Sequence, residues 1–264
     1  MIRRDVQLAD GAAGWALISQ IEHARISAQL AAHCTGRFAA GQVDDSIRRE
    51  VLAAIEHHDD GWADWERSPR QHSESGKPVS FMELEPAEST FIWTKSVAVA
   101  EEHGPLAAWL VAGHFARLLE NSEHAHADRH AKIWLDGVKI ARREAIAQWQ
   151  KMNPAIHTAE LAEEALQWLW SFDELSLWFC CTCPAADDAT SQTEKSRNVG
   201  QDGAIEMKLS ADTPGIATAS PWRFDAPAIE LQAAARVAPA RRYRDWQEVA
   251  AAASSVTLKW RLQA

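Results

Sequence analysis

Four helical segments of this sequence each place a histidine or an aspartate in the apolar stripe, and no other feature constrains the fold as strongly. In one segment Ile47, Val51, Ile55 and Asp59 follow at intervals of four residues, so Asp59 belongs to the face that buries the aliphatic side chains. His58 stands directly before it. The equivalent residues of the other three segments are His23, His114 and Asp173. A fold that buries these stripes must bring imidazoles and carboxylates into its interior.

These residues have a plain interpretation and a functional one. A single histidine on an apolar face is usually a hydrogen-bonded core residue, whereas a buried carboxylate without a partner is costly. A divalent cation would satisfy all of the converging groups together. We therefore predict a metal site with the ligands His23, His58, Asp59, Asp173 and His114. Mixed nitrogen and oxygen ligands suit Mn, Fe, Zn, Ni or Co ions, among which the sequence does not choose.

Hydrophobic periodicity and capping signals predict a mainly α protein. Helices are expected over about 19–34, 46–59, 90–101, 105–120, 129–151 and 159–181. The two ends of the chain differ, because residues 1–19 have the pattern of a hairpin and "SSVTLKWRL" alternates apolar with polar residues. We expect these N- and C-terminal segments to form a small antiparallel β-sheet on the helical core.

The whole chain, residues 1–264, is expected to form a single domain. Its helical core would span about 19–183, and the terminal strands about 1–19 and 204–264. Residues 184–204 contain almost no large apolar side chains, which predicts a flexible excursion between core and sheet.

Composition narrows the classes of partner. The formal net charge of −10 disfavours binding to nucleic acid or to anionic membranes. The sequence has no run of about 18 apolar residues and no charged-then-apolar leader, so we expect a cytoplasmic protein. Thirteen tryptophans make it unusually rich in this residue. They are interpreted first as bulky core packing and second as an aromatic wall around a pocket.

A polar stretch with three prolines, residues 66–90, follows the His58-Asp59 pair and predicts a long loop beside the metal site. Such a loop could bring positive charge to a phosphate and act as a lid. The candidate substrate-binding residues are Trp62, Trp65, Arg70 and Lys77. The plain alternatives are packing support for the tryptophans and ordinary surface charge for Arg70 and Lys77.

Three residues are candidates for catalysis: Asp59, His114 and Asp60. A carboxylate beside a bound ion could orient or deprotonate a water, and an imidazole could contact the substrate. For Asp60, a solvated position at a helix end is the alternative interpretation.

Two further groups could also bind metal. Cys180, Cys181 and Cys183 lie in "CCTC", but structural zinc normally needs paired Cys-x-x-Cys spacing, so small buried thiols explain them better. The histidines of "EHAHADRH" lie in a charged stretch typical of a solvated helix start. The sequence therefore favours one metal ion over two.

The order His23, His58-Asp59, Asp173 resembles the ligand pattern of the HD superfamily of metal-dependent phosphohydrolases. More closely, the chain resembles an uncharacterised bacterial family, domain of unknown function 3891, with an HD-like helical core. The matching stretches are "WALISQIEHARISAQLAAH", "AIEHHDDGWADWE", "SGKPVSFMEL", "AGHFARL" and "FDELSLWFC". The likeness implies an HD-like fold, a metal shell of His23, His58, Asp59 and Asp173, and a role for His114 at a second metal or at the substrate.

The function that follows is a metal-dependent hydrolase acting on a phosphoester, such as a nucleotide-like small molecule. The alternative is a non-catalytic ligand-binding or regulatory protein that keeps an HD-like pocket. A helical redox enzyme with an Fe or Mn centre ranks last, because the paired Glu-x-x-His ligands of that class are not recognisable here.

Overall fold

The computed structural model spans residues 1–264 and describes 1–122, 128–186, 194–200 and 205–264. Its helices in these ranges are α1 (Gln20–His33), α2 (Asp45–His57), α3 (Pro86–His103), α4 (Pro105–Glu120), α5 (Arg129–Met152), α6 (Ala159–Cys181) and α7 (Trp246–Ala252), with short 3-10 turns η1 (Asp60–Trp62), η2 (Trp65–Arg67) and η3 (Phe81–Glu83). The six long helices lie where the periodicity predicts them. The described helices include none that is long and apolar enough to cross a membrane.

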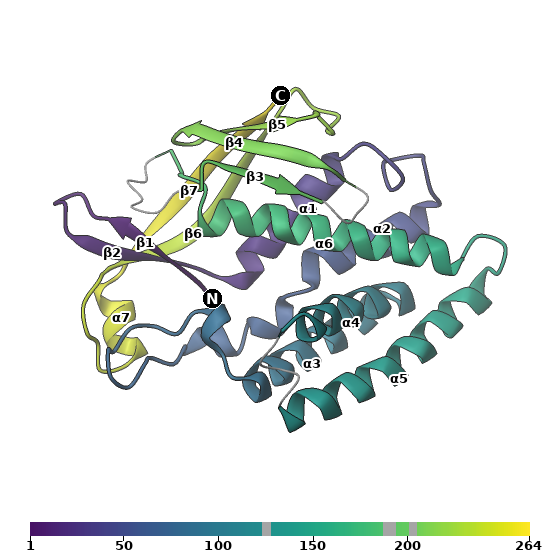
Figure 1. The fold of residues 1–264 in the computed structure, drawn as a ribbon, viewed down its shortest axis with the longest axis horizontal. Helices are drawn as coiled ribbons and strands as arrows, with labels where there is room; N and C mark the ends of the chain where they lie inside the picture. Colours follow the sequence, from purple (N-terminus) through teal and green to yellow (C-terminus); the bar gives the residue numbers. More distant parts are fainter. Residues whose placement is uncertain (123–127, 187–193, 201–204) are drawn as a thin grey trace.

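The strands are β1 (Ile2–Gln7), β2 (Ala13–Ile18), β3 (Ser196–Val199), β4 (Met207–Thr213), β5 (Ile216–Ser220), β6 (Ala228–Pro239) and β7 (Ser254–Gln263). They form one curled sheet in the order β1-β2-β6-β7-β5-β4-β3, drawn in the upper left of Figure 1. The start of the chain joins its end through antiparallel pairing of β2 with β6. Pairing of β5 with β7 is parallel, which makes the sheet mixed.

The predicted fold class is therefore wrong in one main respect. Half of the described residues are helical, but about a fifth lie in strands of a seven-stranded mixed sheet, so the protein is not a helical core with a small antiparallel sheet. Strands β5 and β6 are difficult to recognise from the sequence because many of their buried positions are alanine. Examples are Ala217, Ala219, Ala233 and Ala235. Alanine carries little apolar area and favours helices over strands.

The segment expected to be a flexible excursion contributes to the same sheet. Ser196–Val199, within residues 184–204, forms β3 and pairs antiparallel with β4. Residues 187–193 and 201–204 lie outside the described part of the chain.

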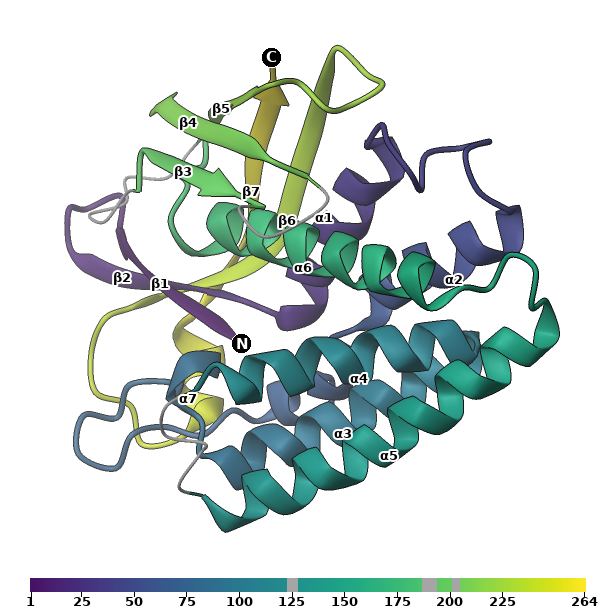
Figure 2. The ribbon, with the colours of Figure 1, turned by 45° about the vertical axis from the view of Figure 1, so that its right-hand side comes forward.

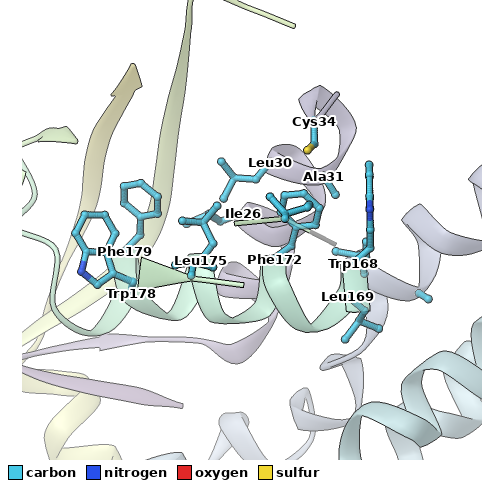
Figure 3. Close-up of a cluster of buried hydrophobic side chains, with 14 of the residues drawn as sticks. Ile26, Leu30, Ala31, Cys34, Trp168, Leu169, Phe172, Leu175, Trp178 and Phe179 are labelled. Atoms are coloured by element: carbon cyan, nitrogen blue, oxygen red, sulfur yellow. The ribbon is translucent and has the colours of Figure 1, made fainter. Parts of the chain in front are cut away.

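Helices α1 and α6 lie between the sheet and the layer formed by α3, α4 and α5 (Figures 1 and 2). Their contact with each other is apolar: Ile26 and Leu30 of α1 face Phe172 and Leu175 of α6 (Figure 3). Burying each such side chain contributes about 1.5–3 kcal/mol. This central pair of helices also carries His23 and Asp173, so the packing that builds the core fixes the positions of both polar residues.

Several tryptophans belong to the core. Trp149, Trp168, Trp178 and Trp260 are among the largest fully buried side chains. The ring of Trp260 meets the edge of Phe179 at a centroid distance of 5.8 Å, which joins β7 to α6. For these four residues, core packing is the correct interpretation.

Candidate metal centre

Four helices and one 3-10 turn meet where the polar residues of the apolar stripes converge. His23 lies in α1, His114 in α4 and Asp173 in α6, each on the buried face of its helix. His58 is the C-cap residue of α2, and Asp59 is the N-cap residue of the tight turn η1. All five residues are buried, with exposed fractions of 7% or less for the whole residue. The structure brings all five predicted ligands together.

Distances between the ligand atoms are short. His23 Nε2 lies 2.8 Å from Asp59 Oδ2 and 3.6 Å from Asp173 Oδ1. His58 Nε2 lies 3.2 Å from Asp173 Oδ1 and 3.6 Å from Asp59 Oδ2. His114 is farther away, with its Nε2 4.0 Å from Asp173 Oδ1. Two imidazoles and two carboxylates thus surround one point, and a third imidazole lies beside it.

The chemistry of this donor set fits a divalent ion. Atoms that bind one metal at about 2.1 Å are roughly 3–3.4 Å apart in octahedral or tetrahedral geometry, close to the separations given above. His23, His58 and Asp173 each offer one atom within 4.8 Å of the others and could hold a metal ion. Asp59 touches both imidazoles, so we include it in the proposed set.

Hydrogen bonds on the far side of each ring orient the two imidazoles. His58 Nδ1 lies 2.8 Å from the carbonyl oxygen of Ile55, so that nitrogen carries the proton and Nε2 is left as the ligand atom. His23 Nδ1 lies 2.7 Å from Ser176 Oγ, whose hydroxyl donates to the carbonyl of Asp173 at 3.0 Å. Such outer contacts fix the tautomer that a metal-binding histidine needs.

A hydrogen bond from outside the cluster also orients the carboxylate of Asp59. Trp62 donates its indole N–H to Asp59 Oδ1 at 3.1 Å, which leaves Oδ2 directed at His23. The turn that carries Asp59 packs closely on α3, where the N–H of Gly61 donates to Ser96 Oγ at 3.0 Å. A Cβ at residue 61 would overlap the carbonyl oxygen of Ile92, so glycine is required for this approach.

Burial and close contact shift the pKa values of the cluster residues. Burial by itself would lower the pKa of His58, but the carboxylates of Asp59 and Asp173 outweigh it and raise this pKa to about 9. Burial likewise opposes ionisation of Asp173, yet the hydrogen bond and the positive charge of His58 hold its pKa well below the usual range. Burial lowers the pKa of His114 to about 4, so its ring is neutral. A bound cation would replace the positive charge that His58 carries.

Other predicted site residues contact different partners. Asp60 Oδ2 lies 2.8 Å from His57 Nδ1. The indole N–H of Trp65 donates to Glu88 at 2.5 Å, and Arg70 forms an ion pair with the same carboxylate at 2.6 Å. Lys77 lies 3.6 Å from Glu83. These contacts do not include the buried cluster, and the roles of these residues in substrate binding or catalysis stay predictions.

The rival metal groups find no support in the described part of the chain. Its cysteines are free thiols, and only the cluster of His23, His58 and Asp173 groups residues suited to hold an ion. Burial raises the pKa of Cys183 to about 12, which keeps that thiol protonated. His130 is exposed on α5, whereas His124 and His126 lie outside the described residues.

Sequence reasoning missed the residues that support the ligands. Ser27, four residues after His23, donates to Ser176 Oγ at 2.7 Å, and Ser176 itself follows Asp173 by three residues. Both serines lie one helical turn from a ligand on the same face. That spacing was the only signal available, and it becomes informative only once the ligand is known.

A cleft of about 400 Å³ reaches the cluster at Asp173 and is lined by residues of α6 and of the β3 end, including Trp170, Glu174, Arg197 and Asn198. A larger cavity of about 760 Å³ lies between the start of α1, β6 and α7. Its walls include Ser19, Glu22 and Glu66 but none of the four proposed ligands.

Comparison with known proteins identifies a family but no function. No curated protein and no solved structure matches the chain. Residues 1–240 match the family described as "Protein of unknown function (DUF3891)", a span that includes every residue of the buried cluster. The chain therefore belongs to the DUF3891 family.

Proposed function

We propose that this protein is a metal-dependent hydrolase that acts on a phosphoester of a small molecule. The observation that carries the proposal is the buried cluster of His23, His58, Asp59 and Asp173, in which ligand atoms from distant parts of the chain lie 2.8–3.6 Å apart. Maintaining two carboxylates in the interior is costly, and a cation offsets that cost. The order of these residues along the chain is similar to that of the ligands in the HD superfamily of phosphohydrolases.

A divalent ion held by this set would polarise a phosphoryl oxygen and lower the pKa of a water. Hydrolysis forms a bond from the water oxygen to phosphorus and breaks the bond from phosphorus to the ester oxygen, while a water proton passes to the departing alcohol. The carboxylates of Asp59 and Asp173 are the anionic acceptors at this position. Asp173, which lines the cleft beside the cluster, orients the attacking water.

His114 is suited to contact the substrate directly. It is buried and neutral, and its Nδ1 has no hydrogen-bond partner among the described residues. A buried, unpaired ring nitrogen is costly, and a polar ligand atom would satisfy it. His114 is therefore proposed to hydrogen-bond the phosphoryl group rather than to support the fold.

The first test is the metal content of protein purified without a histidine tag. We expect about one equivalent of a transition metal, or stoichiometric uptake of Mn²⁺ with a higher unfolding temperature, because an ion that binds only the folded state stabilises it. Metal content below a tenth of an equivalent, with no uptake on reconstitution, would remove the basis of the proposal.

The second test is hydrolysis of a panel of phosphomonoesters and phosphodiesters. Asp59→Ala and His58→Ala should abolish both metal uptake and turnover. Asp64→Ala is the matched control, because Asp64 is exposed and forms an ion pair with Lys95 at 2.7 Å. Ligand binding without turnover by the metal-loaded wild type would instead favour a binding protein.

A further inference from the structure

The cleft beside Asp173 is the feature from which a substrate class follows. Among the four proposed ligands, the side chain of Asp173 has the largest exposed fraction, 10% against 5% for Asp59 and 1% or less for the two histidines. Asp173 also lines the cleft of about 400 Å³, a volume in the range of small-molecule sites. Solvent and ligand can therefore reach the cluster at this carboxylate.

One wall of the cleft is a face of α6. Trp170, Asp173, Glu174 and Leu177 line it, at spacings of three and four residues that place them on the same side of the helix. The helix face that directs Asp173 to the cluster thus continues outward as the wall of the cleft. A molecule in the cleft would lie along α6 with one end at Asp173.

Trp170 is fixed in place at the cluster end of this wall. The guanidinium of Arg117 lies 4.3 Å from the centre of its ring, and the same arginine donates to Gln167 Oε1 at 3.0 Å. The ring of His114 lies 5.4 Å from that of Trp170. The indole therefore links His114, beside the metal centre, to the cleft.

The opposite wall comes from the end of β3, which lies beside α6 in Figures 1 and 2. Arg197 and Asn198 line it. The Arg197 guanidinium is oriented by Glu194, which accepts from Nε at 3.1 Å and from Nη2 at 2.8 Å. Gly200 has a φ of +79° and donates its N–H to Glu174 at 3.5 Å, so the strand end is connected to α6.

The charges of the cleft determine what could occupy it. Asp173 and Glu174 repel an anion, and the protein as a whole carries a net charge of −10. A phosphate would enter only with a cation at the cluster and with the guanidinium of Arg197 on the other wall. The indole of Trp170 offers a flat apolar surface for the remaining part of the molecule.

We propose that this cleft binds the substrate, that Arg197 contacts its phosphate, and that Trp170 packs against a planar organic group. The preferred substrates are then phosphoesters of flat aromatic or heterocyclic alcohols rather than of aliphatic ones. This inference rests on the proposed hydrolase function for its metal and its phosphate. The proposal places the substrate contacts on α6 and β3, whereas the sequence predicted them in and beside the loop of residues 66–90.

The test compares two probes of equal charge, 4-nitrophenyl phosphate and glycerol 3-phosphate, on Mn²⁺-loaded protein. Binding is measured by calorimetry and turnover by phosphate release. Trp170→Leu should weaken binding and lower kcat/KM for the aromatic probe about three- to tenfold and leave the aliphatic probe nearly unchanged. Arg197→Gln should lower the binding affinity for both probes about tenfold. Trp170→Phe, which keeps a flat ring, should retain most of the preference even if the leucine variant folds poorly.

Two further arginine variants complete the design. Arg244→Gln is the matched control, because Arg244 is exposed beside α7 and pairs with Glu248. Arg70→Gln tests the rival placement in residues 66–90. The cleft proposal is overturned if Trp170→Leu and Arg197→Gln equal wild type on both probes, or if only Arg70→Gln weakens binding.

The design separates this inference from the proposed function. Binding of the aromatic probe that is lost in Arg197→Gln, without turnover by any variant, supports the cleft and removes the hydrolase. Turnover that depends on Asp59 but is unchanged in Trp170→Leu and Arg197→Gln supports the hydrolase and removes the cleft. Failure of both probes to bind metal-loaded wild type at millimolar concentration also overturns the cleft proposal.

Discussion

The indole nitrogen of Trp62 lies 3.1 Å from Oδ1 of Asp59 and donates a hydrogen bond to it. The other oxygen of this carboxylate lies 2.8 Å from His23 Nε2. One tryptophan thus determines which carboxylate oxygen faces the centre. Trp62 is 3% exposed and positions Asp59 from within the core, whereas its predicted contact with a substrate stays a prediction.

Replacing Trp62 should weaken metal binding more than it weakens the fold. Trp62→Phe keeps most of the apolar volume but removes the N–H, so the Asp59 carboxylate is free to rotate. Loss of such an outer contact lowers metal affinity about 10- to 100-fold. Competition with a fluorescent chelator measures this affinity. Trp65→Phe is the control, because its N–H donates to Glu88, and an equal loss of affinity in both variants would contradict the assignment.

Ser176 should be the corresponding support for His23. Ser176→Ala removes the partner of His23 Nδ1 and leaves the Ser27 hydroxyl with its longer contact, 3.2 Å to the carbonyl oxygen of His23. We expect metal affinity to fall about tenfold. Titration calorimetry with Mn²⁺ measures it. Ser171→Ala on the same helix is the matched control, because the Ser171 hydroxyl donates to the backbone carbonyl of Gln167 and has no other hydrogen bond among the described residues. Unchanged affinity in Ser176→Ala would show that packing alone orients His23.

The sequence predicted the helices and the cluster for the same reason. A polar residue at the spacing of Ile47, Val51 and Ile55 must be buried with them, and four such helices can satisfy their polar groups only by meeting. Distant residues such as His58 and Asp173 could therefore be paired without any knowledge of the sheet.

The sheet could not be predicted in the same way, since its inner face relies on small residues. In β6 the buried positions include Ala233 and Ala235, and "QAAARVA" is as compatible with a helix as with a strand. Pairing with β2, at the other end of the chain, and with β7, the next strand along it, makes this segment a strand. The cleft was missed for a related reason, because Arg197 reaches α6 only after β3 has joined the sheet.

Gly61 should be indispensable to the turn that carries Asp59. In Gly61→Ala the new methyl group meets the backbone of α3 at Ile92 and Ser96, so the turn must shift. Overpacking of this kind costs about 1–3 kcal/mol. Urea unfolding measures the loss, and metal affinity should fall with it.

A second glycine provides a control in which the same substitution should raise the free energy of unfolding instead of lowering it. Gly137 is exposed in α5, and a methyl group there would meet no other atom within 4 Å. Gly137→Ala should stabilise the protein by about 0.5–1 kcal/mol, because alanine favours the helix. A Gly61→Ala variant as stable as wild type would contradict the close packing of η1 on α3.

Acid should weaken the contact that holds residues 78–83 against β1. Burial opposes ionisation of Glu83, but hydrogen bonds from Arg3, Ser80 and His72 outweigh it and hold the pKa of this carboxyl well below its usual range. A carboxyl whose pKa is lower in the folded state stabilises the protein above the pKa of the unfolded chain, about 4.3. This contribution is lost as the pH falls through the range between the unfolded and the folded pKa.

The free energy of unfolding, measured in urea from pH 6 to pH 3, should therefore fall more steeply for wild type than for Glu83→Gln. Arg3→Gln should flatten the profile similarly, because Arg3 donates to both carboxylate oxygens at 2.8 Å, and the double variant should add little further change. Parallel profiles for wild type and Glu83→Gln would show that the ion pair does not distinguish the folded from the unfolded chain.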